Sequence, residues 1–137
     1  MSENYKKAHA ALDSHLDAYQ STDVAWENAD YKPIVGTPYL KPRFLPAEPE
    51  QAALGSTGSN RLGGIYQVSV IHPIGGGSAA AKAQADAIVS QFKRGTQLTR
   101  DDLTIRVDRA WQGPAMDSEA WYTIPVSIRW FVYAPNT

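Results

Sequence analysis

The amino-acid sequence predicts an α+β fold, with a single mixed, largely antiparallel β-sheet of about four to five strands and two α-helices packed on it. Two segments with apolar residues at intervals of three and four predict the helices, and segments that alternate apolar and polar residues predict the strands. The length of 137 residues fits one domain, residues 1–137, because neither an internal repeat nor a change in composition indicates a boundary.

Two segments carry the helical pattern. The first runs from about Glu3 to Tyr19, and the second begins after Ser78, a suitable N-cap, and stops at Gly95. The expected apolar faces are Tyr5, Ala8, Leu12, Leu16 and Tyr19 in the first helix and Ala81, Ala85, Ile88 and Phe92 in the second. Further alanines in the second segment favour close packing on the sheet.

Three segments alternate clearly and predict strands, namely residues 64–72, 103–107 and 124–132. The last two are expected to pair antiparallel across a long connection. Pro125 lies within the last strand and lacks an amide hydrogen, so that strand should be bulged or only partly paired. Side chains alternate between the two faces of a strand, and this alternation places Tyr66 and Trp130 toward the helices. It places Phe131 and Tyr133 on the opposite face, where they could form an exposed apolar strip.

A proline-rich segment precedes these strands, with prolines at positions 33, 38, 42, 46 and 49. Residues 37–45 nevertheless look extended, with Leu40 and Phe44 on the same face as Pro38 and Pro42. Because these two prolines are an even number apart, their missing amide hydrogens fall on one side and predict an edge strand. Residues 46–62 are expected to form a long, mobile loop, and residues 24–26 a brief strand or an extended connection.

The composition excludes several classes of function. The absence of cysteine removes disulfides, thiolate zinc sites and cysteine nucleophiles. Thirteen basic and fourteen acidic residues give a formal charge of -1, which argues against nucleic acid as the primary partner. The polar start and the lack of an apolar run of about 20 residues predict neither a signal peptide nor a membrane span, hence a soluble protein.

Candidate catalytic groups are few. The run GGGSAAAK from Gly75 to Lys82 lies between a strand and a helix, where backbone amides can bind phosphate, but it lacks the order of a P-loop or dinucleotide motif. A flexible turn is the favoured interpretation, and phosphate binding stays open. His9 and His15 are six residues apart, which does not suit a zinc pair. Adjacent Asp101 and Asp102 would point to opposite faces. We therefore expect no catalytic residue, cofactor or metal.

Self-association fits the remaining features better. The loop with Glu48 and Glu50 could meet a basic surface of a second copy, a heterologous contact that can close a ring. A solvated loop and an ordinary charged surface are the open alternative. The basic stretch consists of Lys93, Arg94, Arg100, Arg106 and Arg109. The residues we expect at a subunit or partner interface are Glu48, Glu50, Arg61, Arg109 and Trp111. Burial of Trp111 is the alternative for that residue.

Five strings in order resemble a family of phage tail terminators. They are AWEN from Ala25, GTPYLKPRFLPAEPE from Gly36, LGSTG from Leu54, GIYQVSVIHPIGGG from Gly64 and WYTIPVSIRW from Trp121. The resemblance spans nearly the whole chain. None of these strings is a catalytic signature, and no functional residue is carried over position by position.

The resemblance implies a structural, non-enzymatic protein of the phage or prophage virion tail, assembled in the cytoplasm of the bacterial host. Such proteins form a hexameric ring that caps the tail tube, ends its polymerisation and presents a surface for head attachment. The implied partners are other copies of the chain, the tail tube protein and a head-completion protein, with no membrane. A head-tail joining protein of the neck is the alternative, followed by a small nucleotide- or phosphate-binding enzyme that uses the glycine run.

Overall fold

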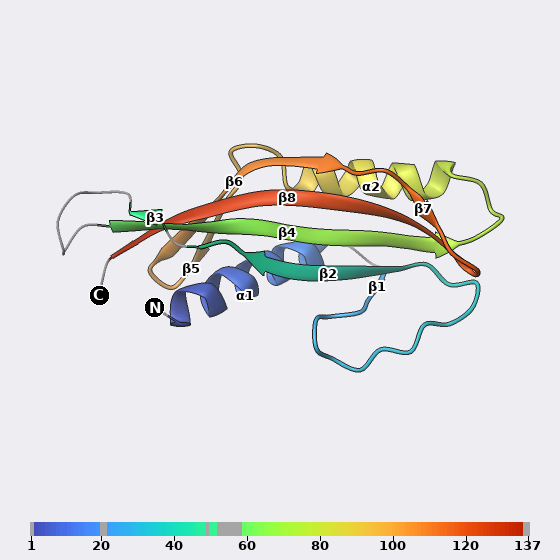
Figure 1. Cartoon of the computed structure of the whole chain (residues 1–137), viewed down its shortest axis with the longest axis horizontal. Helices are drawn as coiled ribbons and strands as arrows, with labels where there is room; N and C mark the ends of the chain where they lie inside the picture. Colours follow the sequence, from blue (N-terminus) through green and yellow to red (C-terminus); the bar gives the residue numbers. More distant parts are fainter. Residues whose placement is uncertain (1, 20–21, 49, 52–58, 136–137) are drawn as a thin grey trace.

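The computed structural model describes residues 2–19, 22–48, 50–51 and 59–135. These described residues form two helices and eight strands, and the strands belong to one sheet (Figure 1). The elements are α1 (Ser2–Tyr19), β1 (Asp23–Val24), β2 (Tyr39–Pro46), β3 (Glu50–Gln51), β4 (Ser59–Pro73), α2 (Ala79–Gln91), β5 (Gln97–Arg100), β6 (Leu103–Gln112), β7 (Met116–Asp117) and β8 (Trp121–Pro135).

The sheet is built around two strands of 15 residues, β4 and β8, which pair antiparallel along their whole length. The strand order is β1-β2-β4-β8-β6-β5, with β3 added to β4 and β7 added to β8. Every pairing is antiparallel except β1 with β2. Figure 1 places β3 at one end of the long strands and β7 at the other.

The α+β class is confirmed, but the prediction of four to five strands is wrong. The missed strands β3, β5 and β7 have only two to four residues, too few to show alternation, and their neighbours in the sheet hold them in place. The predicted loop over 46–62 is also partly wrong, because it contains β3 and the start of β4. Its centre, residues 52–58, lies outside the described residues.

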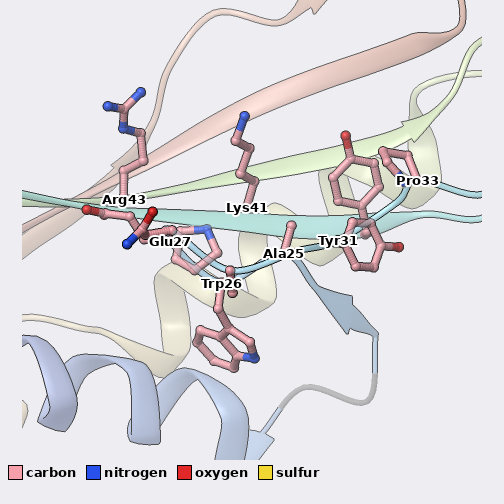
Figure 2. A pocket seen from close by; sticks show the side chains of 11 residues that line it. Ala25, Trp26, Glu27, Tyr31, Pro33, Lys41 and Arg43 are labelled. Carbon is pink, nitrogen blue, oxygen red and sulfur yellow. The ribbon is translucent and has the colours of Figure 1, made fainter.

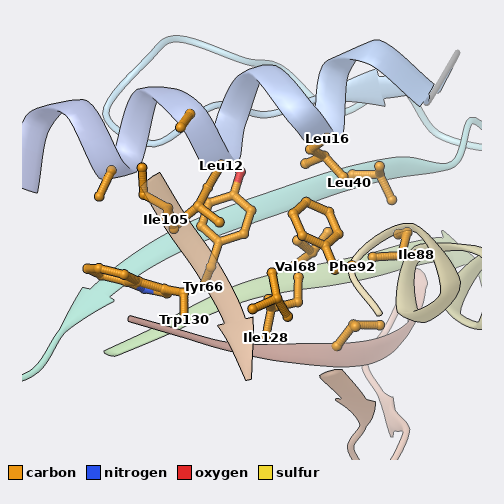
Figure 3. Close-up of a cluster of buried hydrophobic side chains, with 14 of the residues drawn as sticks. Leu12, Leu16, Leu40, Tyr66, Val68, Ile88, Phe92, Ile105, Ile128 and Trp130 are labelled. Atoms are coloured by element: carbon orange, nitrogen blue, oxygen red, sulfur yellow. The ribbon is translucent and has the colours of Figure 1, made fainter. Parts of the chain in front are cut away.

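Both helices pack on one face of the sheet. Figure 3 shows Leu12 and Leu16 of α1 and Ile88 of α2 directed at Tyr66 and at the apolar side chains of β4 and β8. Five alternate residues of β8 are at most 2% exposed: Ile124, Val126, Ile128, Trp130 and Val132. The predicted inward parity is thus confirmed. Within the described residues, no helix covers the other face, which we call the open face.

Strand β2 lies beside the short strand β1 at one edge of the sheet, as its prolines predict. The carbonyl of Leu40 points toward β1, where it accepts a hydrogen bond from the Ala25 amide at 2.7 Å. The backbone nitrogens of Pro42 and Pro46 point to the same side of β2 as this carbonyl, and neither nitrogen carries a hydrogen. The amide of Phe44 also shares it and donates to Glu27 Oε1 at 2.7 Å. The edge of β2 beyond β1 is therefore closed by two prolines and one carboxylate.

The pairing of β6 with β8 is interrupted in two places. A bulge between Val107 and Arg109 shifts the register by one residue at Asp108. Because side chains alternate along a strand, the extra residue turns Arg109 and Trp111 to the open face. The second interruption is at Pro125, where β6 ends and β7 takes over two residues further along, at Thr123. Partial pairing at this proline is confirmed.

The helix ends follow the expected signals only in part. Helix α2 begins directly after Ser78, but the Ser78 side chain makes no capping hydrogen bond, and only its carbonyl accepts from the Lys82 amide at 3.0 Å. Neither described helix has the length and apolar character required to cross a lipid bilayer.

Candidate functional site

A hollow of about 340 Å³ lies between β2 and the connection from β1 (Figure 2). Figure 2 shows Lys41 and Arg43 pointing to one side of β2 and Trp26 pointing to the other, toward the helices. The charged groups that line it are Lys41, Arg43 and Glu27, and Glu27 also accepts a hydrogen bond from the Phe44 amide. This is the chemistry of a shallow contact surface with a preference for anions.

Aromatic contacts hold the wall of this hollow in place. The rings of Tyr31 and Tyr39 lie 5.0 Å apart, and Tyr39 meets Trp121 of β8 edge to face at 5.4 Å. Tyr31 also donates to Asp23 Oδ2 at 3.4 Å. The connection from β1 to β2 is thereby fixed against the sheet, although Ile34 and Val35 at its far side stay exposed at 59% and 87%.

The open face carries a second surface, in which arginines lie over aromatic rings. Arg61 of β4 has its guanidinium carbon 4.6 Å from the centre of the Phe131 ring. Arg109 and Arg129 both approach the Trp111 ring, at 5.1 and 5.6 Å. These distances are typical of cation–π contacts, which hold a guanidinium group over a ring by its face. We call these five residues the arginine face.

Arg129 joins the two halves of the arginine face. It lines a hollow of about 230 Å³ together with Glu48 and Arg61, and it also lies over Trp111. It is the partner of Arg109 in the β6–β8 register, so two guanidinium groups stand on directly opposite positions of neighbouring strands. Like charges in this arrangement repel. Neither arginine has a salt-bridge partner within the described part of the chain.

The sequence-predicted interface residues fall on this surface to different extents. Glu48 and Arg61 line the same hollow, and Arg109 and Trp111 lie side by side on β6. Trp111 is half-buried, between the two alternatives considered for it. Glu50 pairs with Arg61 through the backbone in β3, and its side chain lies outside the described residues. Whether these residues contact a partner stays a prediction.

Sequence reasoning missed Arg129, although a signal was present. Arg129 precedes Phe131 by two residues and so shares its parity on the last strand. The predicted basic stretch is divided by the fold. Arg94 and Arg106 line one small hollow beside Phe131, whereas Arg100 lines another with Lys6 and Lys7 of α1.

A polar cluster lies on the helix side of the sheet, between α1 and β4. The buried Tyr66 hydroxyl donates to Asp13 Oδ1, and His9 Nε2 lies 3.3 Å from the other oxygen of this carboxylate. Burial raises the pKa of Asp13 above its usual value, while the Tyr66 hydrogen bond opposes this shift. Burial and the Asp13 charge together raise the pKa of Tyr66 far above its usual value. The cluster anchors α1 to the sheet.

The other candidate groups have structural contacts. His15 bonds to the carbonyl of Gln91, and His72 to the side chain of Gln84. Asp102 bonds to Lys7 at 3.1 Å, and this hydrogen bond is the main cause of its lowered pKa. The described residues contain no cluster of three or more metal-binding side chains. The glycine run forms a turn before α2, with positive φ at Gly75 and Gly77.

Comparisons with known proteins match this chain to a protein family. The model of the family described as phage tail terminator protein matches residues 7–130. The chain belongs to the phage tail terminator family. It is therefore a structural protein of the phage tail or neck that assembles into the virion with other phage proteins. A comparison with curated proteins gives no match.

Two solved structures share the fold of this family member. One chain, whose description states no function, is 26% identical, with 96% of each chain covered and a TM-score of 0.75. The other comes from the virion of a native gene transfer agent (GTA) particle and is 21% identical, with 91% of this chain and 93% of that chain covered and a TM-score of 0.61. At that identity the second likeness shows the fold alone.

Proposed function

We propose that this protein caps the phage tail tube as a ring of identical copies, a hexamer by analogy with the family. The ring ends polymerisation of the tube and presents the surface to which a head-completion protein attaches. The family match over residues 7–130 carries the proposal. The solved chain from a gene transfer agent virion is consistent with a place in a virion.

The surface chemistry supports a role in assembly. Arginine and tryptophan are the residues most enriched at the energetic centres of protein interfaces, and the arginine face presents both on an uncovered sheet. We propose that Glu48, Glu50, Arg61, Arg109 and Trp111 lie in contacts with neighbouring copies or with the tube.

Polymerisation of purified tail tube protein tests this function. Adding the chain before polymerisation should shorten the tubes seen by electron microscopy, with density for the chain at one end only. Replacing Arg109 and Trp111 together by alanine should abolish the shortening, whereas Ser90→Ala on the exposed side of α2 should not. Tubes of unchanged length with wild-type protein would contradict capping.

The same materials separate capping from the neck role. A tail terminator should bind purified tube protein without the head connector, and native mass spectrometry should then reveal the number of copies in the ring. Binding to the connector but not to the tube would favour a head-tail joining protein.

A further inference from the structure

The charged strand residues on the open face of the sheet are predominantly basic. On β2, β4, β6 and β8, six basic side chains face away from the helices, and Asp108 in the bulge is the one acidic strand residue beside them. The six are Lys41, Arg43, Arg61, Arg106, Arg109 and Arg129. The remainder of the chain, with Asp108 left out as well, holds seven basic and thirteen acidic residues. The charge is thus divided between the open face and the rest of the molecule.

Arg109 and Arg129 lie opposite each other on the arginine face, and no carboxylate of the described residues lies between them as a salt-bridge partner. Two guanidinium groups on partnered positions repel, and a carboxylate placed between them would be held by both. Their shared contact with Trp111 keeps them on the same ring. The pair is therefore a preformed receptor for one or two carboxylates.

A protein carboxylate fits this receptor better than a nucleic acid does. Two rings of this face that could stack on bases are already in contact with guanidinium groups, Phe131 with Arg61 and Trp111 with two arginines. Leu45 and Tyr133, exposed at 41% and 53%, add apolar area near the same end of the sheet.

The far end of the sheet offers the complementary surface. The turn between β7 and β8 exposes Asp117 and Glu119, and Met116 beside them is 58% exposed. Ile74 joins this tip, because its amide donates to the carbonyl of Ala120 at 3.0 Å, and it is itself 45% exposed. We call Ile74, Met116, Asp117 and Glu119 the acidic tip. Neither carboxylate has a salt-bridge partner among the described residues.

The acidic tip cannot reach the arginine face of its own chain. Asp117 pairs with Tyr122, and Arg129 lies seven residues further along the same extended strand, which is about 23 Å. Figure 1 shows β7 at the opposite end of the sheet from β3. A contact between the two surfaces must therefore join different molecules.

We propose that the arginine face of one copy binds the acidic tip of a second copy, with Asp117 or Glu119 between Arg109 and Arg129. Such a contact joins two different surfaces, so repetition produces a ring or a helix and not a closed pair. The proposal rests on the proposed ring and specifies how neighbouring copies meet.

Chemical crosslinking tests the contact directly, because the chain has no native cysteine. Ser127 faces outward opposite Trp111, and Ser118 lies between the two carboxylates of the tip. Mixed Ser127→Cys and Ser118→Cys proteins, treated with a short bis-maleimide, should form a mixed dimer in excess of either homodimer. Ser90→Cys on α2 should not replace Ser127→Cys in this reaction. Equal yields for Ser90 and Ser127 would overturn the proposal.

Charge reversal adds a second, independent test. A face-reversed protein (Arg109→Glu, Arg129→Glu) and a tip-reversed protein (Asp117→Lys, Glu119→Lys) should each lose self-association by roughly tenfold or more. When mixed they should assemble together in alternation, because the intact face meets the intact tip and the reversed face meets the reversed tip. All four changes in one chain should restore assembly. Circular dichroism confirms that each variant is folded.

The outcomes distinguish this contact from the proposed function. Unaltered self-association of both reversed proteins, with tube capping intact, would overturn the contact but leave capping standing. If crosslinking and charge reversal gave the expected results but the wild-type protein had no effect on tube length, the contact would be supported and capping would be contradicted. Cysteine variants that give no specific crosslink, together with a wild-type protein that binds DNA through the same arginines, would overturn the contact in favour of a nucleic-acid surface.

Discussion

Gly64 is the position where a single added methyl group should most strongly displace the arm, by which we mean the end of β2 and the residues that follow it up to Glu48. The end of β2 crosses Gly64 closely, and a Cβ there would lie 2.3 Å from the Leu45 carbonyl oxygen and 2.9 Å from Pro46 Cα. Since a carbon and a carbonyl oxygen approach to about 3.3 Å at best, the arm would have to move by about 1 Å. The hydrogen bond from the Ala47 amide to the Gly63 carbonyl, 2.8 Å long, would be lost.

The expected cost of Gly64→Ala combines both effects. Overpacking costs about 1–3 kcal/mol and the lost hydrogen bond about 1 kcal/mol, so the free energy of unfolding should fall by about 2–4 kcal/mol. At this chain length the melting temperature should fall by about 4 °C per kcal/mol, hence by about 8–16 °C. Thermal melts followed by circular dichroism measure this change, and hydrogen exchange should be faster at the Ala47 amide.

Gly76→Ala is the matched control for this prediction. The nearest atom to a Cβ at Gly76 is the Pro73 carbonyl oxygen at 4.0 Å, and Gly76 does not have a positive φ. This variant should melt with the wild type or slightly above it. If Gly64→Ala and Gly76→Ala had the same melting temperature, the close approach of the end of β2 to Gly64 would be refuted.

Three further predictions concern the anchors of α1 and β2. Tyr66→Phe should lower the free energy of unfolding by about 1–3 kcal/mol in urea titrations, because the half-buried Asp13 carboxylate loses a donor; an unchanged midpoint would exclude that bond. The pKa of Asp13 is raised in the folded state, so the folded protein binds this proton more tightly than the unfolded chain. Wild-type stability relative to Asp13→Asn should therefore rise as pH falls from neutral toward 4, and a fall would refute the assigned burial. Glu27→Ala should cost about 1 kcal/mol by freeing the Phe44 amide, and Glu27→Gln, which keeps Oε1, should cost less; equal losses would mean that the acceptor is unimportant.

Periodicity predicted the parts of the fold that depend on local pattern. Alternation placed Tyr66 and Trp130 inside and Tyr133 outside, and the structure agrees, with exposures of 0%, 1% and 53%. Even spacing of prolines predicted the edge position of β2. These features depend only on which side of an extended strand each residue occupies, and the spacing of the residues in the sequence determines that side.

The features that depend on pairing could not be predicted in this way. The bulge at Asp108 reverses the parity of the following residues, and without it Arg109 would share the buried side with Val107. The opposition of Arg109 and Arg129 follows only from the register of β6 on β8. Likewise, Glu27 is 17 residues from the amide that it binds, so no local signal connects them.

The closed edge of β2 limits how copies of this protein can join. A sheet with free amides along its border can gain strands from other molecules without end, and that is how fibrils grow. With Pro42, Pro46 and the Glu27 carboxylate along this border, such growth has no template there. Copies that meet through this side must use side chains, whose geometry fixes the angle between neighbouring copies. The closed border thus removes one route by which this protein of the virion tail could add strands from further copies.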